Sequence, residues 1–296
     1  MSARGRSAPT EGEQWASAQL AALRSSRYDA AAWESFLGES FRRAAEIRRQ
    51  RSALSAQAVR WTLGGGLATA ALRQTIVRGG RAPSIRGLAS WWMTQALMLD
   101  WHLGMVQELD GAPREKLSVA DALTLSRVAV VPFAACAPPD AVLFLALLGF
   151  AGATDLLDGR FARRRGPTRF GRDFDTLADL AFRAAAVRGA RRAGWLARGP
   201  AWALAGRQAL LVSGAAWSWF GHAERPPMDP ARLARWDAPP LIAGLALAAL
   251  GHRRAAGALL ATAAMIGGAG SLRGMALRGD AAPPHDDHTA AATEEG

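Results

Sequence analysis

The chain has 296 residues, of which half are apolar and 21% are charged, and its formal net charge is +11. This length allows one large domain or two ordinary ones. The positive charge is almost all arginine, since Lys116 is the single lysine. No sequence module or aromatic platform for nucleic acid accompanies that charge, so nucleic acid is not an expected partner. The single cysteine, Cys136, excludes an intrachain disulfide and a cysteine-based zinc site.

Residues 1–55 predict a disordered polar start followed by soluble or surface helices. Between Gln14 and Arg51, apolar residues recur at spacings of three to six with charged residues between them. This pattern is typical of an amphipathic helix that is soluble or lies on a membrane surface. The first residues lack the apolar core of a secretory signal. We therefore expect internal segments to carry the chain into the membrane.

Residues 56–117 contain two interrupted apolar stretches, 61–77 and 87–106, and a turn-rich linker. Charged residues flank or break both stretches, so neither reaches the ~20 uninterrupted apolar residues of a spanning helix. We expect both to be amphipathic helices in the membrane interface, where tryptophan side chains are favoured. After the linker, Ser118 or Asp121 is expected to cap the helix that follows.

Residues 118–278 predict a bundle of six membrane-spanning helices, because apolar segments alternate there with turn-rich or arginine-rich joints. The expected spans are 122–137, 140–157, 174–193, 200–220, 239–251 and 255–272. Residues 279–296 are rich in Pro, Asp, His and Glu and predict a disordered tail. The expected fold class is all-α, a polytopic membrane protein with a six-helix transmembrane bundle and N-terminal amphipathic, interfacial helices.

The orientation in the membrane follows from the arginines. An even number of spans places both ends of the bundle on one side of the membrane. Residues 160–172 carry six arginines and are expected to form a loop, and such loops are typical of the cytoplasmic side. We therefore expect a multi-pass protein of a bacterial cell membrane, with its functional site facing the cytoplasm.

Four aspartates at regular intervals stand out in the middle of the chain. Asp155 and Asp158 are three residues apart, and Asp175 and Asp179 are four apart, so each pair lies on one face of its helix. The two pairs can face each other across a helix hairpin. Four close carboxylates repel one another unless a cation lies among them, and oxygen ligands select Mg²⁺, Mn²⁺ or Ca²⁺ over zinc. Because Mg²⁺ commonly binds substrate phosphates as well, the cluster predicts a phosphate-bearing substrate.

The residues around the acids allow two interpretations. Arg163 could neutralise the same phosphates, and the missing Cβ atoms of Gly159 and Gly171 would let a ligand approach the backbone. Alternatively, the acids pair with neighbouring arginines as a solvated charge band at the interface. Arg127 and Arg207, single arginines inside apolar spans, could bind a phosphate of the acceptor or pair with an aspartate.

The spacing resembles the signature of the CDP-alcohol phosphatidyltransferase family. It runs Asp155-x2-Asp158-Gly159-x2-Ala162-Arg163, then Gly171-x3-Asp175-x3-Asp179, and every fixed residue of the signature is present. The loop of seven residues between the two halves is shorter than in many members. The stretch "ADALTLSRVAVVPF" is also similar to the start of the family's first span, and "MLDWHLGM" followed by "DGAPR" resembles an N-terminal extension of an actinobacterial subgroup.

The resemblance implies an integral membrane transferase of phospholipid biosynthesis. It would move a phosphatidyl or other phospho-alcohol group from a CDP-linked lipid donor to the hydroxyl of a small alcohol or lipid acceptor, with release of CMP. Asp155, Asp158 and Asp175 would hold one or two Mg²⁺ or Mn²⁺ ions, with Asp179 at the same metal site as the general base. The resemblance also implies a homodimer and a nucleotide pocket. The residues implied for that pocket are Gly159, Ala162, Arg163 and Gly171.

Two other functions stay open at this point. A cation- or proton-coupled membrane transporter could use the aspartates, but it predicts acids near the membrane midplane and broken or repeated spans. A non-catalytic member of the same family could act as a scaffold, although it would not need the complete signature. Within the enzyme class, the acceptor is open among glycerol phosphate, inositol phosphate, phosphatidylglycerol and other alcohols.

Overall fold

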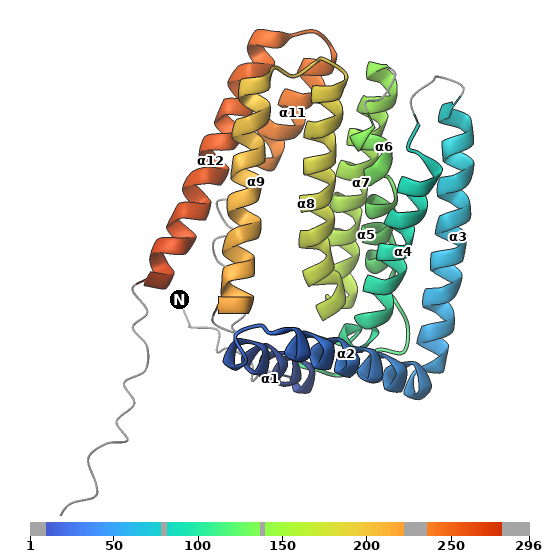
Figure 1. The fold of residues 1–296 in the computed structure, drawn as a ribbon. Helices are drawn as coiled ribbons and strands as arrows, with labels where there is room; N and C mark the ends of the chain where they lie inside the picture. The colour runs from blue at the N-terminus through green and yellow to red at the C-terminus, as the bar shows by residue number, and fades with distance from the viewer. Residues whose placement is uncertain (1–9, 78–81, 137–139, 222–235, 280–296) are drawn as a thin grey trace, which may run out of the picture.

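The computed structural model describes residues 10–77, 82–136, 140–221 and 236–279, and the regular elements in these ranges are helices (Figure 1). An isolated bridge between Gln107 and Pro113 is the only β pairing in these ranges. The all-α prediction is therefore confirmed. The first nine residues of the predicted disordered start, and residues 280–296 of the predicted tail, lie outside the described residues.

The first two helices, α1 (Glu11–Ser25) and α2 (Ala30–Gln50), lie across one end of a bundle formed by the other long helices (Figure 1). The side chain of Asp29 caps α2 by accepting a hydrogen bond of 2.7 Å from the Ala32 amide. Few residues of these helices are buried, which agrees with the amphipathic pattern of the sequence. The N-terminal segment therefore covers the end of the bundle from outside.

The next two helices lie differently from α1 and α2. Helices α3 (Ser52–Val77) and α4 (Ile85–Trp101) run alongside the bundle and do not lie across its end as α1 and α2 do (Figure 1). Two of the charges that interrupt their apolar stretches have partners. Arg73 Nε donates a hydrogen bond of 2.8 Å to the carbonyl of Pro83, and Asp100 forms an ion pair with Arg48. These two charges are therefore compensated within the protein.

The first predicted span is two helices, α5 (Val119–Ala129) and α6 (Val131–Ala135), and the break follows from Pro132. Proline has no amide hydrogen for the carbonyl four residues earlier, and its ring crowds that carbonyl. This carbonyl belongs to Val128, and it accepts a hydrogen bond of 3.0 Å from the indole nitrogen of Trp91. Helix α4 therefore satisfies the polar group that the proline releases.

Replacing Trp91 with phenylalanine should destabilise the fold by about 1–3 kcal/mol, the usual cost of leaving a buried carbonyl without a donor. The aromatic packing is largely kept, so the loss reports mainly on the hydrogen bond to Val128. Thermal unfolding of the detergent-solubilised protein would measure the change. An unfolding midpoint equal to that of the wild type would mean that another group, such as water, satisfies this carbonyl equally well.

The arginine-rich segment is mostly helical, which corrects the expected loop over residues 160–172. Helix α7 (Ala141–Arg165) continues beyond its predicted end, and α8 (Arg169–Arg192) begins after three residues. Gly166 ends α7 with a φ of +80°, a conformation that favours glycine. The side chain of Thr168 then caps α8 by accepting a hydrogen bond of 2.8 Å from the Gly171 amide. The turn between the two helices is therefore tight, and it brings both halves of the aspartate motif together.

Four further elements complete the bundle beside α8 (Figure 1). They are α9 (Arg198–Ala216), the π-helical turn η2 (Trp217–Gly221), α11 (Ala238–Ala249) and α12 (Arg253–Gly279). Helices α11 and α12 pack closely, and a Cβ on Gly244 would lie 2.8 Å from the side chain of Leu260. Within the described ranges, α7 is long and apolar enough to cross a membrane, and α11 is a shorter apolar helix.

Candidate functional site

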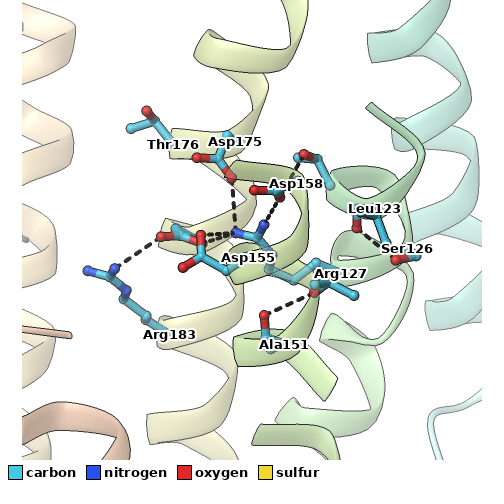
Figure 2. Close-up of polar contacts among 12 residues, drawn as sticks. Leu123, Ser126, Arg127, Ala151, Asp155, Asp158, Asp175, Thr176 and Arg183 are labelled. Atoms are coloured by element: carbon cyan, nitrogen blue, oxygen red, sulfur yellow. Dashed lines mark hydrogen bonds and ion pairs between the residues drawn. The ribbon is translucent and has the colours of Figure 1, made fainter. Parts of the chain in front are cut away.

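The four aspartates of the motif lie on two successive antiparallel helices, α7 and α8, and Figure 2 shows three of them, Asp155, Asp158 and Asp175. One carboxylate oxygen from each of Asp155, Asp158 and Asp175 lies within 4.8 Å of the other two. Asp179 lies one turn further along α8 and contacts the same arginine as the other three. The two pairs therefore face each other across the helix hairpin, as their spacing predicts.

Arg127 of α5 extends its guanidinium into the middle of this acid cluster (Figure 2). Its Nη1 atom lies 3.0 Å from Oδ1 of Asp175 and 3.4 Å from Oδ1 of Asp155. It also forms ion pairs with Asp158 and Asp179. Of the two roles considered for Arg127 from the sequence, the structure has the pairing with aspartate, and it involves all four acids of the motif.

The acids are buried to different degrees, so the site has an inner and an outer side. The side chain of Asp158 is 6% exposed, whereas those of Asp155 and Asp175 are 49% and 39% exposed. Asp158 also accepts a hydrogen bond of 3.2 Å from the hydroxyl of Thr124. A ligand from solvent can therefore reach Asp155 and Asp175 directly, while Asp158 forms the floor of the site.

These residues suit a divalent metal of the Mg²⁺ class. The donors are all carboxylate oxygens, which such ions prefer. The three ligand oxygens lie within 4.8 Å of one another. Mg²⁺ binds oxygens at about 2.0–2.1 Å, so they would have to move somewhat closer together, which small side-chain rotations allow. A cation already lies at this point in the form of the Arg127 guanidinium, and Oδ1 of Asp175 has no hydrogen-bond partner of good geometry. The carboxylate donor set thus fits a metal, at a point that the guanidinium occupies in this structure.

Gly171, an implied nucleotide-pocket residue, has a packing role in the structure. A Cβ at this position would lie 2.7 Å from Oδ1 of Asp121 and 2.9 Å from the hydroxyl of Thr168. Asp121 is fully buried, accepts a hydrogen bond of 2.9 Å from Thr168, and forms a capping box with Ser118 at the start of α5. Of the two predicted caps, Ser118 is the N-cap, and Asp121 completes the capping box and also ties α5 to the start of α8.

The other three residues implied for that pocket follow the acids on α7. A Cβ on Gly159 would lie 3.2 Å from Nη1 of Arg163, so the glycine makes room for that arginine. Arg163 is exposed, and Ala162 lines a hollow of about 10 Å³ together with residues of α5 and Gly166. This hollow holds about one water molecule. A cytidine nucleotide would therefore have to bind on the exposed surface beside Arg163 or open this region.

A second charge network, which was not predicted as a unit, extends from the acid cluster toward α11. Arg183 Nη2 lies 3.0 Å from Oδ2 of Asp179, and its Nη1 lies 3.2 Å from Oδ1 of Asp237. Asp237 is 0% exposed and also pairs with Arg207 of α9. An aspartate directly before "APP" does signal a helix start, but its two arginine partners lie far away in the sequence. A Cβ on Gly267 would overlap the Arg207 side chain, so α12 also accommodates this network.

The N-terminal segment contacts the turn between α7 and α8. Buried Arg169 forms an ion pair of 2.5 Å with Glu13 and donates a hydrogen bond of 2.8 Å to Thr10. Arg114, in the linker, donates a hydrogen bond of 2.6 Å to the carbonyl of Arg165. The residues before the bundle thus fix both sides of the turn that positions the aspartates.

A comparison with known families matches residues 117–268, just over half of the chain, to the family described as CDP-alcohol phosphatidyltransferase. Searches of curated proteins and of solved structures gave no match. The matched region begins one residue before the cap of α5 and contains the whole acid cluster. Members of this family transfer phosphate-containing groups from a CDP-alcohol to an acceptor alcohol and generally need a divalent metal. The chain belongs to the CDP-alcohol phosphatidyltransferase family.

Proposed function

We propose that this protein is a membrane enzyme that transfers a phosphatidyl group from CDP-diacylglycerol to the hydroxyl of an acceptor alcohol and releases CMP. The observation that carries the proposal is the convergence of Asp155, Asp158 and Asp175 on one point, with their oxygens within 4.8 Å of one another. Three carboxylates of this kind suit a divalent cation that also binds a diphosphate. Membership of the family supplies the reaction class.

In this proposal the exposed acids, Asp155 and Asp175, face the donor, and the buried acid, Asp158, anchors the metal. Asp155, Asp158 and Asp175 would hold one or two Mg²⁺ or Mn²⁺ ions, whose positive charge would stabilise the negative charge that develops on the departing CMP. Asp179 would accept the proton of the acceptor hydroxyl as general base. A new bond then forms between the acceptor oxygen and the phosphatidyl phosphorus, and the bond from that phosphorus to the CMP oxygen breaks. Exposed Arg163 would bind the donor phosphates as a charge-assisted hydrogen-bond donor.

We further propose that the bundle is embedded in a cell membrane with the acid cluster near its cytoplasmic surface. The apolar helix α7 carries Asp155 and Asp158 close to its arginine-rich end, and arginine-rich ends are typical of the cytoplasmic side. This position would suit a donor whose acyl chains stay in the bilayer while its headgroup reaches the acids. The six-span topology and the homodimer implied by the family resemblance belong to the same proposal.

The compact acid cluster favours this reaction over the transporter that the sequence also allowed. The four carboxylates gather on adjacent turns of two helices around one arginine (Figure 2). A transport pathway would instead distribute charged groups along a route through the membrane. The transporter also offers no role for a signature shared with a phosphate-transferring family.

The proposal is tested by incubating the purified protein with CDP-diacylglycerol, Mn²⁺ or Mg²⁺ and a panel of alcohols while release of CMP is followed. We expect CMP release that depends on one of the alcohols and falls to background after chelation of the metal with EDTA. Restoring the metal should restore turnover. Metal-dependent ion flux in liposomes without any nucleotide, together with no CMP release from any acceptor, would favour the transporter.

A further inference from the structure

The guanidinium of Arg127 is held by the acid cluster and by little else (Figure 2). Its side chain is 1% exposed, and its Nε atom has no hydrogen-bond partner among the described residues. Among the described residues, its guanidinium donates hydrogen bonds to Asp158 and Asp179 and forms its remaining ion pairs with Asp155 and Asp175. Arg127 therefore depends on the four carboxylates for its charge balance.

A divalent metal and this guanidinium would need the same three carboxylates. Nη1 of Arg127 approaches Oδ1 of both Asp155 and Asp175, while Nη2 bonds Oδ2 of Asp158. These three residues form the group of converging ligands. Because a bound Mg²⁺ needs oxygens at about 2.0–2.1 Å, and because two cations at one point repel each other, the guanidinium cannot keep its place among these oxygens once a metal binds.

We propose that Arg127 is an internal counter-cation, which neutralises the acid cluster in the metal-free protein and leaves these oxygens when a divalent metal binds. The inference rests on the proposed metal site. It has two measurable consequences for this chain. Arg127 stabilises the metal-free fold, because it separates carboxylates that would otherwise repel. It also weakens the apparent affinity for the metal, because the metal must replace its hydrogen bonds.

The same displacement would free the group that we propose as the general base. Oδ1 of Asp179 accepts a hydrogen bond from Arg127, and its Oδ2 accepts one of 3.0 Å from Arg183. While Arg127 stays in place, both oxygens are engaged with cations. Once it leaves, Oδ1 can accept the proton of the acceptor, and Arg183 still holds the other oxygen in position. Metal binding and readiness of Asp179 are therefore coupled through one side chain.

The test is a titration of the purified full-length protein in detergent with Mn²⁺, followed by electron paramagnetic resonance. Replacing Arg127 with methionine should lower the dissociation constant for Mn²⁺ by about tenfold or more, since a hydrogen bond between charged groups is worth about a factor of ten or more. The same variant should have a lower unfolding temperature without metal and a larger rise on adding Mn²⁺ than the wild type. Arg127→Lys keeps the charge with fewer donors and should lie between the two.

Two further variants make each outcome decisive. Arg48→Met removes the arginine of another ion pair, the one between Arg48 of α2 and Asp100 of α4. This variant should bind Mn²⁺ as the wild type does. Asp158→Asn should weaken Mn²⁺ binding; if it does not, the proposed metal site itself is wrong. If Asp158→Asn weakens binding but Arg127→Met binds Mn²⁺ no more tightly than the wild type, the site stands and the counter-cation role is wrong. An Arg127→Met protein that folds only with Mn²⁺ present would support the inference.

Discussion

Replacing Asp179 with asparagine should lower kcat by about 10²- to 10⁴-fold, the range expected when a general base is removed. Asparagine has nearly the same shape, but its amide cannot accept the proton of the acceptor hydroxyl. Asp179 lies outside the group of three converging ligands, so the donor should still bind. The expected signature is therefore a large loss of kcat with a KM for CDP-diacylglycerol close to that of the wild type.

A matched control for this change lies six residues earlier on the same helix. Asp173→Asn makes the identical chemical change at an acid that is out of step with the motif and pairs with Arg172. We expect its kcat to stay near the wild-type value. Turnover of Asp179→Asn at a comparable rate would remove Asp179 from the chemistry, and a selective rise in KM would instead give it a role in binding.

The position of the acid cluster was predictable from the sequence because two simple rules determine it. Spacings of three and four residues place Asp155 with Asp158, and Asp175 with Asp179, on common helix faces. The expected joint between the two helices then folds one back on the other, and the structure has that turn at Gly166. These are local rules, and the structure has the two pairs facing each other as they require.

The partners of the acids were harder to predict because they come from distant parts of the chain. Arg127 was recognised as a single arginine in an apolar segment, but its choice between a phosphate and an aspartate depends on how α5 packs against α7 and α8. The ion pair between Glu13 and Arg169 joins residues far apart in the sequence. Periodicity carries no information about such contacts, since it describes one helix at a time.

The division of the first span was not predicted, because it depends on contacts between helices. The charges within the apolar stretches of α3 and α4 also have partners that the sequence does not reveal, since Asp100 pairs with an arginine on α2 and Arg73 donates to a backbone carbonyl. Pro132 stands in the sequence, but a break there leaves the Val128 carbonyl without its helical partner. That the indole of Trp91 replaces this partner could not be predicted from the sequence. In each case a single residue looked unfavourable until its tertiary partner was known.

Replacing Asp237 with alanine should produce the largest loss of stability in the bundle, about 3–5 kcal/mol, because it leaves the buried charge of Arg207 without an acidic partner. Asp237 is completely buried between Arg183 and Arg207. Its removal leaves two positive charges facing each other, and Arg207 then has no ion-pair partner among the residues the structure describes. The midpoint of unfolding in a titration with a denaturing detergent would measure this change.

Asp140→Ala is the matched control, because both aspartates precede the first residue of a helix. Asp140 is exposed and only caps α7, by accepting a hydrogen bond of 2.7 Å from the Leu143 amide, so its loss should cost about 1 kcal/mol. The double variant Asp237→Ala, Arg207→Met should recover part of the stability, since it removes the stranded charge as well. Equal losses for the two single variants would mean that the buried network adds no more stability than a surface helix cap.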